Sequence, residues 1–256
     1  MLVIIPMSGT GNRFIEAGYS DPKPLIPVLG KPIIEWVAGM FPKECEILFI
    51  CREDHLKTTA MRQVLERIRP AARILSVPGH KLGPVHSLCL ASAAIPDETE
   101  TLVSYCDYYM HWNYEEFAAE VSARECSGAI PCYTGFHPHL IPTKNVYASC
   151  RVDENSNLLE IREKFSFEKD KARALHSPGL YYFRSGKILK DYSHRLIQRN
   201  IQLNGEFYVS LIYNLLVQDG LKTWVPTNVT KFCQWGTPED LREFLVWEQM
   251  VNGGTQ

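Results

Sequence analysis

The opening residues, 1–37, constrain the fold of this 256-residue chain more than any other stretch. Residues 2–6 form an uninterrupted apolar run, which is typical of a strand buried on both faces. The run leads into the sequence SGTGNR at 8–13, where Gly9 and Gly11 allow backbone N–H groups to close around an anion. Arg13 adds a fork of donors suited to phosphate oxygens. This order predicts a buried strand that ends in a phosphate-binding loop.

A lysine held between two prolines follows the loop. Pro22 and Pro24 restrict the backbone on either side of Lys23, so the ammonium group is presented from a fixed place. Pro32 then stands where a helix would begin. A dinucleotide-binding loop would need a third glycine, and a Walker loop would need a lysine and a serine or threonine at its end; this sequence has neither. The plainer alternative is a glycine turn beside a surface arginine and lysine.

Composition narrows the class of protein. With 45% hydrophobic residues and a net charge of −2, the chain can bury a large core and shows no basic surface for nucleic acid or membrane. No apolar run approaches the roughly 20 residues of a membrane span, and the opening lacks the basic start of a signal peptide. The eight cysteines show no close pairing, so we expect buried, reduced thiols in a cytoplasmic protein.

The order of strands and helices predicts the architecture. Strands at 47–51 and 73–77 flank a helix at 53–69, and this alternation favours a doubly wound sheet with ligands at the carboxyl ends of its strands. A fourth strand, 101–105, ends at Asp107. A carboxylate at the end of a buried strand is costly unless it is compensated, and Mg²⁺ bridging phosphates is the natural compensation. The alternative for Asp107 is a helix cap, although the next helix more plausibly starts at Asn113.

The combination of SGTGNR at 8–13 and PKPL at 22–25 before a helix resembles the sugar-1-phosphate nucleotidylyltransferase family. Weaker matches are GLYYF at 179–183 and GTPEDL at 236–241, so the resemblance extends over nearly the whole chain. In the second of these, Thr237 would cap a helix that Pro238 begins. It implies a single Rossmann-like α/β domain with a mixed, mostly parallel central sheet flanked by helices. We therefore expect one domain at 1–245, with a nucleotide-binding half at 1–110 and an acceptor-binding half at 111–245, and a C-terminal tail at 246–256.

The resemblance also implies roles for particular residues. Catalysis would fall to Arg13, Lys23 and Asp107, with Asp107 as the Mg²⁺ ligand. Backbone and side chains around the nucleotide would come from Met7, Ser8, Gly9, Thr10, Gly11, Lys81 and Gly83. The acceptor would be held by Glu163, Lys164, Gly179 and Glu206. For Lys81 the alternative is a simple strand-to-helix turn, and for Glu163 and Lys164 it is a solvated charge pair.

The chain departs from the family pattern at four positions. Phe165 replaces the proline that usually follows Glu163 and Lys164, and Leu211 and Ile212 stand where a Thr-Asp pair is usual. Gln234 replaces the usual second metal-binding aspartate, and a neutral amide oxygen is a weaker ligand for Mg²⁺. The interpretation that we favour is that Asp107, phosphates and waters hold the metal; the other is that catalysis is impaired.

The resemblance implies a transfer of a nucleoside monophosphate from a nucleoside triphosphate to a small phosphorylated acceptor, with release of pyrophosphate. The amino-acid sequences of these motifs most resemble those of the cytidylyltransferases of capsule modification, a branch that includes CTP:phosphoglutamine cytidylyltransferase. We therefore expect CTP as the donor. Two alternatives stay open: a catalytically degenerate nucleotide-binding module and an NAD-dependent oxidoreductase. We expect His80 and His86 to be structural, and residues 108–112 to form an acceptor wall or the interface of a homo-oligomer.

Overall fold

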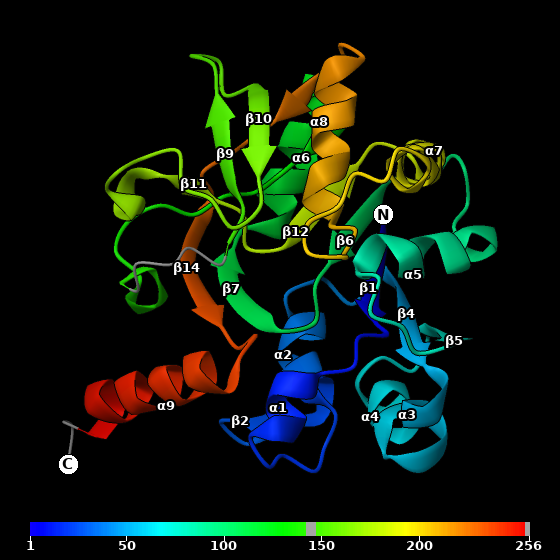
Figure 1. The fold of residues 1–256 in the computed structure, drawn as a ribbon, viewed down its shortest axis with the longest axis vertical. Helices are drawn as coiled ribbons and strands as arrows, with labels where there is room; N and C mark the ends of the chain where they lie inside the picture. The colour runs from blue at the N-terminus through cyan, green and yellow to red at the C-terminus, as the bar shows by residue number, and fades with distance from the viewer. Residues whose placement is uncertain (142–146, 254–256) are drawn as a thin grey trace.

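The computed structural model describes residues 1–141 and 147–253. Within them, a seven-stranded central sheet has the order β13-β8-β12-β6-β1-β4-β5, in which β12 runs antiparallel to both neighbours and the other pairings are parallel (Figure 1). The strands of this sheet are β13 (Thr223–Trp224), β8 (Gly128–Ala129), β12 (Leu180–Phe183), β6 (Thr101–Ser104), β1 (Leu2–Met7), β4 (Glu46–Arg52) and β5 (Arg73–Val77). The mixed, mostly parallel α/β sheet is as predicted.

Helices cover both faces of this sheet. The helices are α1 (Asn12–Glu16), α2 (Ile33–Gly39), α3 (Glu53–Thr58), α4 (Met61–Ile68), α5 (Pro84–Leu90), α6 (Tyr114–Arg124), α7 (Gly186–Gln198), α8 (Val209–Gln218) and α9 (Pro238–Gly253). Val3 and Ile5 of β1 pack into one core with α2, α4 and α6, whereas Leu2 and Ile4 pack into the other with α5, α7 and α8. The central strand is therefore buried on both faces, as its apolar run predicts.

Smaller sheets and single turns complete the domain in the described ranges. Strands β9 (Ser149–Val152), β10 (Leu158–Arg162) and β11 (Leu175–His176) form one sheet, and β2 (Pro27–Val28) pairs with β3 (Lys31–Pro32). Strand β7 (Tyr108–Trp112) pairs with β14 (Val229–Gln234). The 3₁₀ turns are η1 (Lys23–Leu25), η2 (Ser92–Ala94), η3 (Pro138–Leu140) and η4 (Lys171–Arg173).

Several local predictions need correction. The single helix expected at 53–69 is two helices, because Thr59 has an extended backbone and its Oγ1 accepts a hydrogen bond from the Met61 N–H, which starts α4 anew. Residues 108–112, for which no secondary structure is predicted, form strand β7. Residues 246–253, expected as a tail, continue helix α9, and 254–256 lie outside the described residues.

Two expected helix caps agree with the structure. The Asn113 side chain accepts from the Glu116 N–H and begins α6, and Thr237 Oγ1 accepts from the Asp240 N–H at the start of α9. Each of the eight cysteines lies in the described residues and carries a free thiol, although Cys45 and Cys89 are half-buried instead of buried. In the same part of the chain, no helix is long and apolar enough to cross a membrane.

Candidate active site

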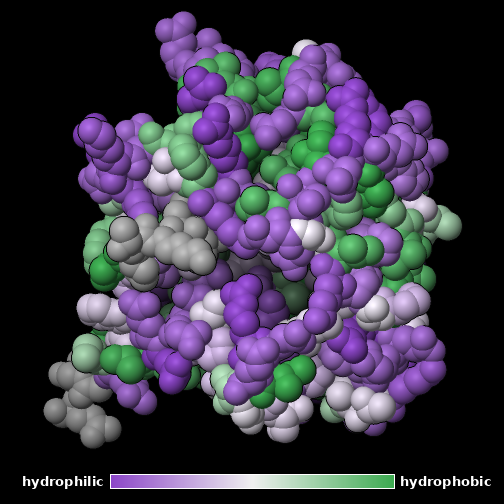
Figure 2. All heavy atoms as spheres, viewed as in Figure 1, coloured by the Kyte–Doolittle hydropathy of each residue, from purple (hydrophilic) through white to green (hydrophobic). Residues whose placement is uncertain are grey.

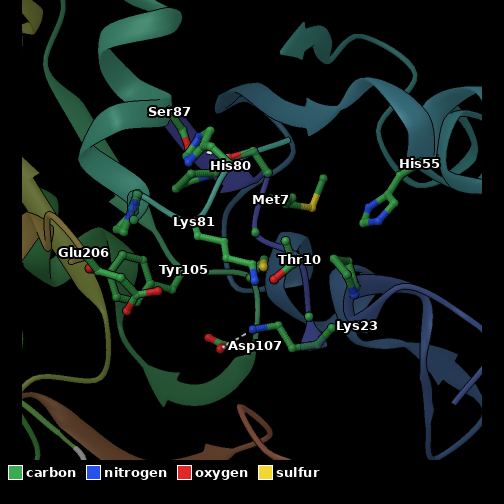
Figure 3. A pocket seen from close by; sticks show the side chains of 18 of the residues that line it. Met7, Thr10, Lys23, His55, His80, Lys81, Ser87, Tyr105, Asp107 and Glu206 are labelled. Carbon is green, nitrogen blue, oxygen red and sulfur yellow. Dashed lines mark hydrogen bonds and ion pairs between the residues drawn. The ribbon is translucent and has the colours of Figure 1, made fainter. Parts of the chain in front are cut away.

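Two neighbouring strands bring the predicted phosphate-binding loop and Asp107 together. β1 and β6 are parallel neighbours, so their carboxyl ends lie at the same edge of the sheet. The glycine loop at 8–11 follows β1, and Asp107 follows β6. Figure 3 shows Thr10, Lys23 and Asp107 at the rim of the resulting cavity. Topology therefore joins two motifs that lie far apart in the sequence.

Lys23 and Asp107 form an ion pair at this edge. Lys23 lies in η1 between its two prolines, and its Nζ donates to Asp107 Oδ2 at 2.7 Å. Burial alone would lower the pKa of Lys23, but the Asp107 carboxylate outweighs burial and the pKa stays above its ordinary value. The Lys23 ammonium is therefore charged at neutral pH and is held where both flanking cavities open.

Two cavities meet at this ion pair. The first has a volume of about 240 Å³, and it is lined by the following predicted residues: Met7, Ser8, Gly9, Thr10, Gly11, Arg13, Lys23, Lys81, Gly83 and Asp107. The second has a volume of about 320 Å³, and its predicted lining residues are Glu163, Lys164, Gly179 and Gln234. Arg13, Lys23 and Asp107 line both. In Figure 2 a hollow opens near the centre of this face, bordered mainly by hydrophilic side chains. The geometry is that of two binding sites that share their charged groups.

Gly83 meets a different neighbour from the one expected. A Cβ atom there would lie 2.7 Å from the Phe207 backbone nitrogen, and the φ of Gly83 is +83°. The Phe207 N–H donates to the Leu82 carbonyl at 2.9 Å, and the Val85 N–H donates to the Phe207 carbonyl at 3.1 Å. The glycine therefore lets the segment at 206–208 pack against the loop. Its contact with a nucleobase stays a prediction.

This packing also changes the expected place of Glu206. Its side chain lines the first cavity, together with Lys81, and not the second cavity where an acceptor residue was expected. Figure 3 shows Glu206 on the opposite side of the cavity from His55. The physical reason is that the Phe207 backbone pairs with the loop around Gly83. No local sequence pattern predicts this pairing.

The second cavity has a tightly packed wall. A Cβ at Gly179 would lie 2.9 Å from the Tyr105 ring, and the Tyr105 N–H donates to the Gly179 carbonyl at 2.9 Å. Gly179 thus makes room for Tyr105, which lines both cavities. On the same cavity, Ser210 Oγ donates to Glu163, and Lys164 Nζ lies 5.7 Å from the centre of the Tyr208 ring. Glu163 and Lys164 are thus fixed within the cavity wall and are not a solvated pair.

Gln234 and Asp107 lie against the same glycine. A Cβ at Gly236 would be 2.5 Å from Gln234 Nε2 and 3.2 Å from Asp107 Oδ2. The Trp235 N–H donates to the Asp107 carbonyl at 3.0 Å, which fixes the end of β14 beside the end of β6. The Gln234 amide and the Asp107 carboxylate therefore lie close together, and the role of Gln234 as a second metal ligand stays a prediction.

The residues present fit a magnesium ion that is held jointly with substrate. The described residues contain no group of three or more histidine, cysteine, aspartate or glutamate side chains that could hold a metal. Mg²⁺ does not need such a group, because it commonly binds one or two carboxylates together with substrate phosphates. Asp107 opens onto both cavities with the Gln234 amide nearby, which suits this mode of binding.

Comparison with known proteins identifies the family. A model of the MobA-like NTP transferase domain matches residues 3–168 of the 256. The chain belongs to the MobA-like NTP transferase family. The matched range includes the Lys23–Asp107 ion pair and the residues of the first cavity other than Glu206 and Tyr208. The family match supports a nucleotidyltransferase. A comparison with curated proteins finds no match.

Solved structures share the fold of this NTP transferase. A nucleoside-diphosphate-sugar pyrophosphorylase from Vibrio cholerae is 19% identical, with a TM-score of 0.76 over 95% of this chain and 99% of the other. An inositol-1-phosphate CTP transferase from T. maritima is 15% identical, with a TM-score of 0.71 over 98% and 96%. A Bacillus anthracis protein provisionally named a glucose-1-phosphate thymidylyltransferase, solved with sucrose, is 15% identical, with a TM-score of 0.71 over 96% and 95%. These likenesses confirm the fold.

Sequence reasoning missed several residues that line the two cavities of this transferase. Tyr105 and Tyr208 line both, and His55 and Ser87 line the first. Tyr105 lies two residues before Asp107 and Tyr208 two after Glu206, so proximity to a predicted residue was an available signal. His80, expected to be structural, also lines the first cavity.

Glu163→Gln is expected to change how stability depends on pH. Burial raises the pKa of the Glu163 carboxyl to about 7, although Ser210 and Lys164 act in the opposite direction. Because the pKa is higher in the folded state than in the unfolded chain, wild type loses stability as pH rises from about 4.3 through 7. The variant lacks this loss, so its free energy of unfolding relative to wild type should rise by about 2 kcal/mol between pH 5 and 8.5. Denaturant-induced unfolding of both proteins at the two pH values measures this change. If the difference in unfolding free energy between variant and wild type is the same at both pH values, the raised pKa of Glu163 is contradicted.

Proposed function

We propose that this protein transfers a nucleoside monophosphate from a nucleoside triphosphate to a small acceptor that carries a phosphate monoester, and that pyrophosphate is released. The observation that carries this proposal is the Lys23–Asp107 ion pair at the junction of two cavities. A triphosphate in the first cavity and an acceptor phosphate in the second would meet at Lys23. The family to which the chain belongs supports the same reaction type.

The chemistry follows from the residue types at this junction. An acceptor phosphate is largely a dianion at neutral pH, because its second pKa is about 6, so it attacks the α-phosphorus without a general base. One P–O bond forms at the α-phosphorus as the bond to the leaving pyrophosphate breaks. Lys23 relieves the repulsion between the two phosphates, and Arg13 and the N–H groups at 9–11 neutralise charge on the pyrophosphate. Mg²⁺ bound at Asp107 would add charge neutralisation at the same place.

We favour CTP as the donor, and as acceptor a phosphorylated metabolite other than an ordinary hexose phosphate, used in the synthesis or modification of surface polysaccharide. The departures at Phe165, Leu211 and Ile212 support an unusual acceptor. The inositol-1-phosphate CTP transferase with the same fold lends some support to CTP, whereas the provisionally named thymidylyltransferase does not. The cavity wall formed by Tyr105, Tyr208 and Glu163 suits a polar acceptor.

Pyrophosphate release tests the proposal. Purified protein with Mg²⁺ is given CTP, UTP, dTTP, ATP or GTP, each with a pool of phosphate-monoester acceptors. We expect release with CTP that depends on acceptor and is lost in Asp107→Asn. A clear preference for another triphosphate would overturn the choice of CTP while leaving the reaction intact. Release that persists in Asp107→Asn would overturn the assigned site.

Gln234 favours a second candidate, a module that binds triphosphate without turning it over. The amide beside Asp107 gives one carboxylate where the family pattern has two. Saturable triphosphate binding without pyrophosphate release would match this candidate, and Gln234→Asp would then be expected to restore release. We do not propose the oxidoreductase alternative, because the family match is to NTP transferases.

A further inference from the structure

Three side chains from three separate segments form a closed hydrogen-bonded cluster in the wall of the first cavity. His80 Nε2 lies 3.1 Å from Ser8 Oγ and 3.1 Å from Ser87 Oγ, and the two hydroxyl oxygens are 2.5 Å apart. Ser8 follows β1, His80 precedes α5, and Ser87 is within α5. Both serines are buried, and all three residues line the cavity. Figure 3 shows His80 and Ser87 side by side, across the cavity from Lys23 and Asp107.

Hydrogen-bond geometry determines which ring nitrogen of His80 carries the proton. The Leu82 N–H lies 3.3 Å from His80 Nδ1 and donates to it, so Nδ1 is the acceptor. In a neutral ring, Nε2 therefore carries the hydrogen and donates toward the serines. Burial, His86 on α5 and Arg52 at the end of β4 all lower the pKa of His80, which keeps the ring neutral near pH 7.

Counting hydrogens in the cluster leaves one without an acceptor. The His80 Nε2–H donates to one serine, and one hydroxyl donates to the other hydroxyl. The remaining hydroxyl hydrogen cannot go to Nε2, which is already protonated. Among the described residues, neither Ser8 Oγ nor Ser87 Oγ has a hydrogen-bond partner outside the cluster. A buried donor without an acceptor is costly, so the cluster is suited to a ligand that supplies one.

We propose that His80 is a positioning residue for the nucleotide: it holds Ser8 and Ser87 so that one hydroxyl hydrogen is directed at an acceptor atom of the bound nucleoside triphosphate. The inference rests on the proposed function, because it names a ligand of the same cavity. This role of His80 also explains how the glycine loop after β1 and the loop before α5 are held in fixed positions relative to each other. The His80 ring lies within hydrogen-bond distance of Ser8 after β1 and of Ser87 on α5, and it accepts from the Leu82 N–H of its own loop.

Matched substitutions separate this role from simple packing. His80→Gln can place an amide N–H near the position of Nε2 and keep the donor to the serines, whereas His80→Asn can keep only an acceptor near Nδ1 for Leu82. His80→Ala removes both. His194→Ala is the control, because His194 is exposed on α7, away from both cavities. Titration calorimetry with CTP and Mg²⁺ measures triphosphate binding directly, and steady-state rates give KM for each substrate and kcat.

We expect His80→Ala and His80→Asn to raise the Kd and KM for the triphosphate about tenfold, with kcat and the acceptor KM within about threefold of wild type. His80→Gln is expected to stay close to wild type in all of them. Normal triphosphate binding by a folded His80→Ala protein would overturn this inference alone. So would equal losses in His80→Gln and His80→Asn, because a packing role does not distinguish them as the donor role does. Absence of triphosphate binding by wild type would instead overturn the proposed function.

Discussion

Replacing Lys23 by alanine is expected to lower kcat at least about 100-fold while the fold survives. The Lys23 ammonium lies at the junction of the two cavities, where the attacking phosphate and the α-phosphate would both approach it. The dianionic acceptor phosphate and the negatively charged α-phosphate repel each other strongly in a partly buried site, and a fixed ammonium between them removes most of that cost. The effect should fall mainly on kcat, because the contact is strongest when the phosphates are closest. Single-turnover pyrophosphate release measures it.

Lys43→Ala provides the matched control for this experiment. Lys43 is exposed and lines neither of the two cavities, so its removal changes the net charge equally without touching the site. Thermal melts of both variants establish that each is folded. A folded Lys23→Ala protein with near-normal turnover would show that the ion pair is structural and that the site has been assigned wrongly.

Asp107→Asn is expected to abolish most Mg²⁺-dependent turnover, with a loss of at least about 100-fold. The substitution keeps the size of the side chain but removes the carboxylate charge that suits the metal. It also removes the counterion of Lys23, so the balance shifts toward burial and the pKa of Lys23 falls. Both effects act on the same step. Measuring kcat against Mg²⁺ concentration distinguishes the two effects. A higher Mg²⁺ concentration can offset weaker metal binding, but it cannot restore the counterion of Lys23.

Asp191→Asn serves as the comparison variant, since Asp191 pairs with Lys187 on the exposed side of α7. It should leave both the rate and its Mg²⁺ dependence unchanged. Titration of Mg²⁺ in the presence of CTP should show weaker binding by Asp107→Asn alone. Metal affinity equal to that of wild type would contradict the role given to Asp107 as a ligand.

Local sequence signals predicted the features that depend on neighbouring residues. The apolar run of β1, the helix starts at Asn113 and Thr237, and the mixed α/β order agree with the structure. Interruptions and long-range pairings were not predictable in the same way. The break at Thr59 depends on one hydrogen bond to Met61, and a continuous apolar pattern conceals it.

The candidate site shows the same contrast between local features, which the sequence predicts, and long-range contacts, which it does not. Gly9 to Arg13 and Lys23 were recognisable because a phosphate-binding loop and a lysine between prolines are chemical patterns within a few residues. The place of Glu206 was not, because it depends on Phe207 pairing with the loop around Gly83, more than 120 positions earlier in the chain. Sequence proximity carries no information about such a contact.

The sequence by itself determined the buried central strand, the glycine loop after it and the fixed ammonium of Lys23, because each depends on backbone preferences and side-chain chemistry within one short segment. Only the tertiary structure decided which groups meet. It placed Asp107 2.7 Å from Lys23 and joined Ser8, His80 and Ser87 in one cluster. Parallel strands bring distant residues to one edge of a sheet, and the packing of the whole core sets which of them come into contact.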